Sequence, residues 1–337
     1  MDAPVRVAIV GAGRMGAFHA RALSGVAEVD VVALADPDPH TASLADELGI
    51  PVTVGSVDDL ISSEVAEAWI VAAPTPLHPS LVATALDREI PVLCEKPLSL
   101  DLAAGLALQQ RVGDLILQVG FWRRFSPPWS MAKAAIDEGK IGRPLMLRLS
   151  QWDAQPPPAA FCDPAVSGGL AVDCGIHEFD LIEWLTGKTV TRVLARPLPI
   201  VEESLAVVGD VDNLVVLVEL DDGAVATVDL SRNARYADDV RTEVLGSNGA
   251  LFVEMFPAGR LRIGGPDGMK RLVEADVEDA MVAGVAEQAR AFVRRVKGGS
   301  VLAPGAGEAN RALAIALAAR ESADRGTWVG LAGAVSG

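Results

Sequence analysis

The stretch that decides the fold is Val5-Arg6-Val7-Ala8-Ile9-Val10-Gly11-Ala12-Gly13-Arg14-Met15-Gly16, near the start of the chain. The run Val5–Val10 is rich in β-branched residues, which predicts a buried strand. Gly11 to Gly16 match G-x-G-x-x-G: the first glycine allows a tight turn, the second lets the backbone approach a pyrophosphate, and the third lets a helix pack on the strand. The helix candidate Met15–Ser24 follows. Strand, loop and helix therefore stand in the order that a dinucleotide-binding loop requires.

The same loop predicts which groups hold the cofactor. Asp36 follows the second expected strand, Val29–Leu34, and lies 20 residues after Gly16. An acidic side chain there accepts hydrogen bonds from the ribose hydroxyls and repels a 2'-phosphate, which indicates NAD rather than NADP. Asp36 could instead cap the helix that begins after Pro37, a role that aspartate fills well. The phosphates would lie at the helix N-terminus, where N–H groups and the helix dipole favour negative charge, against Gly11, Ala12, Gly13, Arg14, Met15 and Gly16.

Short apolar strands alternate with helices through the first 120 residues. Near-continuous apolar runs fit strands that are covered on both faces, as in a parallel sheet with helices on either side. We therefore predict an N-terminal Rossmann domain over residues 1–120 with a doubly wound parallel sheet, giving the α/β class. The expected strands are Val5–Val10, Val29–Leu34, Ala68–Ala72, Val92–Cys94 and Leu115–Val119, and the expected helices are Met15–Ser24, His40–Leu48, Pro79–Arg88 and Leu102–Arg111.

The pattern changes after Gly120, where longer strands alternate apolar with polar residues and Asp-Asp-Gly and Ser-Asn-Gly predict hairpin turns. We predict a C-terminal α+β domain over residues 121–337, with a large open sheet of mixed or antiparallel strands. An open apolar face usually meets helices or a second copy, so we expect a homodimer or homotetramer through this sheet. The last helix can also pack back on the first domain. The expected strands are Leu145–Asp153, Leu214–Leu220, Val225–Ser231 and Thr242–Leu245, and the closing helices are Val285–Val296 and Gly307–Arg325.

Composition argues against several classes of partner. The 337 residues carry a formal net charge of -16, whereas a protein that holds phosphate backbones collects Lys and Arg on one face. We therefore expect no nucleic-acid or membrane partner, and no apolar run approaches the roughly 20 residues that span a bilayer. The three cysteines form no CxxC pair or zinc-spaced cluster, so we expect no metal and a reduced, cytoplasmic setting. We expect no signal peptide, because Val5–Val10 is too short for its apolar region.

Two later segments carry candidate catalytic residues. Lys96 lies in Cys94-Glu95-Lys96-Pro97-Leu98 after an expected strand, and open parallel sheets bind ligands at the carboxyl ends of their strands. The usual alternative for a lysine is a surface position. Asp173 and His177 are four residues apart and Asp180 lies three further on, so a helix would put all three on one face. A neutral imidazole can take a proton from a secondary alcohol while a carboxylate orients it. The alternative is a buried His177 that bonds Asp180 for packing.

Four motifs in order resemble those of the family of glucose-fructose oxidoreductase, inositol 2-dehydrogenase and the MocA proteins. They are the Gly11–Gly16 loop, Pro74-Thr75-Pro76-Leu77-His78, Glu95-Lys96-Pro97 and Asp173-x-x-x-His177, and the resemblance covers essentially the whole chain. It implies that His177 takes the hydroxyl proton, that Lys96 polarises the reacting oxygen, and that Asp173 positions the substrate or the histidine. It also implies that the nicotinamide end of the cofactor is lined by Pro74, Thr75, His78, Glu95 and Lys96, although Pro74 to His78 could also be only a helix-starting turn.

The run Phe121-Trp122-Arg123-Arg124-Phe125 is similar to one in inositol dehydrogenases, although Trp122 is bulkier than usual there and the loop Pro156–Asp163 is atypical. This likeness implies a polyol or sugar substrate that loses hydride from one CH–OH group to NAD. Arg124 could equally be an ion-pair residue. Alternatives are a dehydrogenase or reductase of another sugar, dihydrodiol or imine, or a non-catalytic NAD-sensing regulator, which should lack part of the catalytic group. The implied substrate contacts are Lys96, Trp122, Arg123, Asp153, Asp173, His177 and Tyr236.

Overall fold

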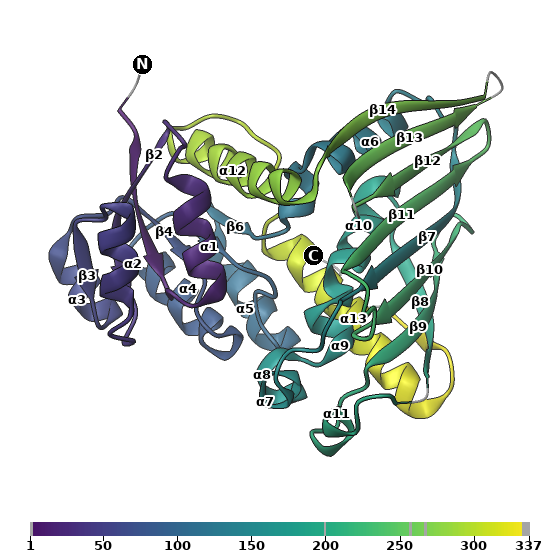
Figure 1. Cartoon of the computed structure of the whole chain (residues 1–337), viewed down its shortest axis with the longest axis horizontal. Helices are drawn as coiled ribbons and strands as arrows, with labels where there is room; N and C mark the ends of the chain where they lie inside the picture. Colours follow the sequence, from purple (N-terminus) through teal and green to yellow (C-terminus); the bar gives the residue numbers. More distant parts are fainter. Residues whose placement is uncertain (1–2, 199, 256–257, 266–267, 332–337) are drawn as a thin grey trace. The chain divides into compact units, whose positions relative to one another are not determined.

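The computed structural model describes residues 3–198, 200–255, 258–265 and 268–331 (Figure 1). The chain divides into two compact units: unit 1 contains residues 1–122 and 282–309, and unit 2 contains residues 123–281 and 310–337. Two long helices therefore contribute to both units. Helix α12 (Val277–Val296) begins in unit 2 and ends in unit 1, and helix α13 (Ala306–Arg325) begins in unit 1 and ends in unit 2.

Unit 1 contains six parallel strands in the order β3-β2-β1-β4-β5-β6. The strand order reverses between β1 and β4, which is where open α/β sheets bind their ligands. This confirms the predicted doubly wound sheet and adds β3 and α3, which the sequence patterns did not predict. The strands are β1 Val5–Val10, β2 Val29–Ala35, β3 Val52–Val54, β4 Ala68–Val71, β5 Val92–Cys94 and β6 Leu117–Val119. The helices are α1 Arg14–Leu23, α2 Thr41–Leu48, α3 Val57–Ser63, α4 His78–Asp87 and α5 Leu102–Val112, with short 3-10 turns η1 Thr75–Leu77 and η2 Trp122–Phe125.

The core of unit 1 combines strands from the first third of the chain with a helix from near its end. Ile9, Leu34 and Ile70 are buried in the same apolar cluster as Phe292 and Val293 of α12. Burial of side chains of this size contributes about 1.5–3 kcal/mol each. Helix α12 is therefore part of the apolar core of unit 1. None of the helices in the described ranges is both long and apolar enough to cross a bilayer.

Unit 2 is built on nine strands in the order β14-β13-β12-β11-β7-β10-β9-β8-β15. Strands β7 and β10 are parallel and the other neighbours are antiparallel, which confirms the predicted mixed sheet. The strands are β7 Pro144–Trp152, β8 Val190–Pro197, β9 Asn213–Leu220, β10 Val225–Ser231, β11 Asp239–Gly246, β12 Gly249–Glu254, β13 Ala258–Gly265, β14 Gly268–Asp276 and β15 Val329–Gly330. The remaining helices are α6 Pro127–Asp137, α7 Ala159–Cys162, α8 Pro164–Ser167, α9 Leu170–Asp173, α10 Gly175–Thr186 and α11 Glu203–Val207.

The two faces of this sheet differ. Alternate residues of β10 are buried, and α10 packs against β7 and β10, as Figure 1 shows for the helix-covered side. Apolar side chains on neighbouring strands are exposed on the opposite alternation, including Met146, Val215 and Leu245. Ion pairs share that alternation, such as Arg148 with Glu243. The sheet thus has one face packed by helices and one with mixed apolar and charged side chains.

Candidate active site

The glycine loop between β1 and α1 has the backbone geometry of a phosphate cradle. Gly11 has φ +93°, and a Cβ there would lie 2.5 Å from the backbone nitrogen of Ala73. A Cβ on Gly16 would lie 1.8 Å from the carbonyl oxygen of Gly11, so only glycine lets the helix approach the loop this closely. Beside Gly13, by contrast, there is open space within 4 Å. The loop therefore fits a pyrophosphate at the start of α1, as the motif predicts.

Asp36 connects the end of β2 to this loop. The backbone N–H of Ala12 donates to its Oδ2 at 2.6 Å, and the N–H of Asp38 donates to its Oδ1 at 2.8 Å. The alternative role of Asp36 as a helix cap is wrong, because α2 begins at Thr41 and its N-cap residue is His40. The carboxylate is instead fixed beside the glycine loop. Each of its oxygens has a further lone pair that can accept a hydrogen bond from a hydroxyl group.

The loops after β4 and β5 are joined by one buried histidine, His78. The ring of His78, the first residue of α4, contacts the carbonyl oxygens of Pro97 at 2.7 Å and Ala73 at 2.8 Å. Burial lowers the pKa of His78, against the opposite effect of the two carbonyl groups. The loop with Pro74 and Thr75 is thus tied to the loop that carries Lys96.

Glu95 is buried directly before Lys96. Its Oε1 contacts Nε2 of His19 at 2.8 Å, and its Oε2 accepts the backbone N–H of Lys96 at 3.2 Å. Burial alone would raise the pKa of Glu95, but the hydrogen bond and charge of His19 outweigh it, so this pKa lies below its ordinary value. The half-buried Lys96 therefore follows a carboxylate that α1 and the Lys96 backbone hold in place.

In unit 2 Asp173 lies in a different helix from His177 and Asp180, so the single helix that would put all three on one face is not formed. Helix α9 ends at Asp173 and α10 begins at Gly175, with Cys174 between them. The N–H of His177 bonds the carbonyl of Cys174 rather than continuing the helical ladder from Asp173. A Cβ on Gly175 would lie 2.9 Å from Leu230, so the glycine permits close packing of this junction on β10. Asp173 and His177 thus flank a helix junction.

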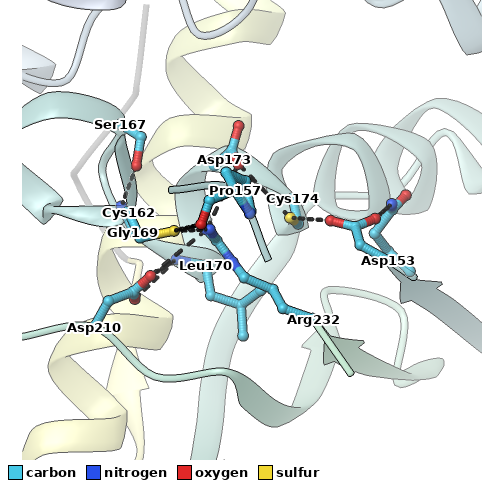
Figure 2. A network of polar contacts seen from close by, with 11 residues as sticks. Asp153, Pro157, Cys162, Ser167, Gly169, Leu170, Asp173, Cys174, Asp210 and Arg232 are labelled. Carbon is cyan, nitrogen blue, oxygen red and sulfur yellow. Dashed lines mark hydrogen bonds and ion pairs between the residues drawn. The ribbon is translucent and has the colours of Figure 1, made fainter. Parts of the chain in front are cut away.

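Cys174 links Asp173 with Asp153, which follows β7. The Cys174 thiol lies 3.3 Å from Oδ2 of Asp153 and 3.8 Å from Oδ2 of Asp173 (Figure 2). Burial raises the pKa of Asp153, the bonds from Cys174 and Gln151 oppose this, and the charge of Asp173 adds to it. The structure therefore brings two predicted substrate contacts, Asp153 and Asp173, to either side of one thiol.

Arg123 is buried and is connected to Asp153 by hydrogen bonds. Its guanidinium donates to Glu178 and to the side-chain oxygen of Gln151, and the Gln151 amide donates to Asp153. Glu178 is fully buried, and burial raises its pKa to about 7, although the charge of Arg123 acts in the opposite direction. The structure thus connects Arg123 to Asp153 through a glutamine.

The remaining predicted residues lie in different settings. Trp122 is buried in unit 1, whereas Tyr236 is two-thirds exposed and its hydroxyl donates to Asp239 at 2.6 Å. Arg124 forms an ion pair with Asp180 through two hydrogen bonds, in agreement with its interpretation as an ion-pair residue.

Three further residues around Asp173 were not predicted as site residues from the sequence: Arg232, Asp210 and Cys162. Arg232 is completely buried and lies 3.5 Å from carboxylate oxygens of both Asp173 and Asp210, and it also donates to the sulfur of Cys162 (Figure 2). Burial alone would lower the pKa of Arg232, but the acidic groups around it raise it. The signal was present, because Arg232 continues the alternation of buried residues along β10.

Comparisons with known proteins find a matching family for the N-terminal and for the C-terminal part of the chain. Residues 5–121 match the oxidoreductase family with an NAD-binding Rossmann fold, and residues 129–252 match the GFO/IDH/MocA C-terminal domain. The chain is 35% identical over 328 residues to the myo-inositol dehydrogenase Hyg17 of Streptomyces leeuwenhoekii, covering 95% of this chain and 98% of that protein. It is 34% identical over 257 residues to the scyllo-inositol 2-dehydrogenase (NAD(+)) of Bacillus subtilis, covering 75% of each.

A solved structure extends the similarity to three dimensions. The scyllo-inositol dehydrogenase from Lactobacillus casei, with bound cofactor NAD(H) and scyllo-inositol, superposes with a TM-score of 0.85 at 28% identity, covering 98% of this chain and 99% of that one. With matches that include the glycine loop, the strands of both sheets and nearly the full length, the chain belongs to the GFO/IDH/MocA family of NAD-dependent dehydrogenases acting on CH–OH groups.

Proposed function

We propose that the protein oxidises a secondary hydroxyl of a cyclitol or sugar with NAD, as an inositol 2-dehydrogenase does. The observation that carries the proposal is the match over 95% of the chain to a myo-inositol dehydrogenase. It is supported by Lys96 at the carboxyl end of β5 and by Asp173 and His177 at the junction of α9 and α10.

Unit 1 supplies the proposed cofactor contacts. The loop from Gly11 to Gly16 would hold the pyrophosphate. Asp36 would accept hydrogen bonds from the ribose hydroxyls and disfavour the 2'-phosphate of NADP. Bound NAD supplies the nicotinamide ring that accepts hydride. Glu95 and His78 are buried with polar atoms bonded to the protein, so we assign them to shaping the loops that present Thr75 and Lys96.

The proposed proton chemistry uses three side chains. A ring nitrogen of His177 takes the proton of the reacting hydroxyl, and Nζ of Lys96 donates a hydrogen bond to the same oxygen. The Asp173 carboxylate orients the substrate or the imidazole. Asp153 accepts a hydrogen bond from a second hydroxyl of the substrate ring. A buried hydroxyl without such a partner would cost about 1–3 kcal/mol. Arg123 acts on the substrate through Gln151 and Asp153, while Trp122 and Tyr236 remain predicted substrate contacts.

The open face of the second sheet supports a proposal of self-association. Met146 and Leu245 are paired neighbours on β7 and β11, and both are at least two-fifths exposed. We assign this face to a homodimer or homotetramer contact, which sedimentation velocity of the wild type and of Leu245→Glu tests. A monomeric wild-type protein contradicts it.

The function is tested with a panel of inositols and aldoses, with NAD reduction followed by nicotinamide absorbance. We expect turnover with at least one cyclitol or sugar, and none with the Lys96→Ala variant, which should retain near-native NAD affinity in calorimetry. Lys140→Ala is the control, because Lys140 forms an exposed ion pair with Glu138. Retained turnover in Lys96→Ala would refute the role of Lys96, and a wild-type protein inactive on the whole panel would refute the substrate class.

A further inference from the structure

Arg232 is a charged side chain with no access to solvent. It follows β10 directly, where the alternation that buries Val228 and Leu230 also directs it to the covered face of the sheet. A buried guanidinium is destabilising unless opposite charges are close to it. Its position therefore requires a local set of acidic partners.

Two carboxylates provide that charge: Asp173 ends α9, and Asp210 binds the first residue of α9. Nη2 of Arg232 lies 3.5 Å from Oδ2 of Asp173, the last residue of α9, and 3.5 Å from Oδ2 of Asp210. Asp210 in turn accepts the backbone N–H of Leu170, the first residue of α9, at 3.0 and 3.1 Å. Figure 2 shows the guanidinium between these groups.

The loop before α9 is shaped to admit the Asp210 carboxylate. Gly169 has φ +73°, and a Cβ there would lie 2.6 Å from Oδ1 of Asp210. Burial raises the pKa of Asp210, whereas its bond from Leu170 and the charge of Arg232 act in the opposite direction. Asp210 and Arg232 thus fix both ends of a four-residue helix, and Asp173 is held at its end.

We propose that Arg232 is a positioning residue for the reaction: its buried guanidinium, anchored by Asp210, holds the Asp173 carboxylate in the orientation that the substrate meets. This inference rests on the proposed function. Because it is fully buried, Arg232 acts through Asp173 and does not itself touch substrate. Asp173 retains a partly exposed side chain, as a group that meets a substrate must.

A double-mutant cycle with Asp173 tests the inference in the full-length protein. A misplaced catalytic group costs on the order of 100-fold in rate, so we expect Arg232→Met to lower kcat/KM for the polyol about that much while NAD affinity stays near native. Arg232→Lys should recover part of the loss. In an Asp173→Asn background, Arg232→Met should cost little more, because its target is already removed.

The controls separate positioning from folding and from the choice of substrate. Arg235→Met removes an exposed arginine three residues away, paired with Glu202, and should behave as the wild type. Equal losses from Arg232→Met with and without Asp173 would overturn the inference, as would an equal loss in Arg235→Met. If Arg232→Met does not fold, the cycle with Arg232→Lys decides.

A crystal structure of the Arg232→Met variant tests the position of the Asp173 carboxylate without any measurement of turnover. This test therefore stays valid even if the proposed function is refuted. We expect the Asp173 carboxylate to leave its position beside Cys174, and an unmoved carboxylate overturns the inference. A wild-type protein that oxidises no polyol refutes the proposed function alone.

Discussion

Glu178 should make the stability of the protein depend on pH in the neutral range. Its carboxyl group is fully buried in α10, and burial raises its pKa from 4.5 to about 7 despite the nearby Arg123. The folded protein therefore binds this proton more tightly than the unfolded chain does. The resulting stabilisation is complete below pH 4.5 and is lost as the pH rises through about 7. Since one pKa unit equals about 1.4 kcal/mol, the difference amounts to about 3 kcal/mol.

The substitution Glu178→Gln isolates this effect, because an amide of the same shape cannot ionise and can still accept from Arg123. Denaturant unfolding from about pH 5 to about pH 8.5, followed by tryptophan fluorescence, gives the free energy of unfolding for both proteins. We expect the variant to gain about 2.5 kcal/mol relative to the wild type across this range, because the lower end lies just above the unfolded pKa. Asp153, Asp210 and Glu183 are present in both proteins, so their own raised pKa values cancel.

A matched control uses Glu138, an exposed carboxylate paired with Lys140. Glu138→Gln should follow the wild type at every pH. If the difference between wild type and Glu178→Gln is the same at both ends of the range, the reasoning about burial is wrong.

Two further predictions concern the cofactor loop. Replacing Asp36 with serine removes the charge that faces a 2'-phosphate, so the ratio of kcat/KM for NAD over NADP should fall by about tenfold or more; an unaltered ratio would remove Asp36 from cofactor selection. In Gly16→Ala the new Cβ would meet the Gly11 carbonyl at 1.8 Å, so the loop must shift and NAD affinity in calorimetry should fall by at least about tenfold. Gly25→Ala, with no atom within 4 Å of its Cβ, is the control, and equal affinities of the two variants would contradict the cradle.

The parts of the fold that were predictable depend on local pattern. The glycine loop, β1 and α1 follow from adjacent residues, because the turn chemistry lies within the motif itself. Strand β3 was missed because it has only three residues at a sheet edge, Val52–Val54, none of them buried, and is too short to show a period. The return of α12 into unit 1 has no local signal, since its partners lie at the other end of the chain.

The candidate site also combines residues that local sequence indicates with residues that only tertiary packing brings together. Strand ends and spacing indicate Lys96, Asp173 and His177 only as candidates, and their roles are implied by the family resemblance. Neither signal predicts the interruption at Cys174, because the helical spacing continues through it. Arg232 could have been found from the alternation of β10. Asp210 could not, because its bond to Leu170 spans 40 residues of sequence and depends on tertiary packing.

The shared helix α12 has a consequence for how the chain matures on the ribosome. The first 122 residues contain every strand of the cofactor-binding sheet, yet Phe292 and Val293, which complete its apolar core, are synthesised far later. At about 5–20 residues per second, the delay is on the order of 10 to 30 seconds. During that time the nascent sheet exposes apolar surface that a chaperone could cover. The cofactor-binding unit begins first and is completed after most of its neighbour has emerged.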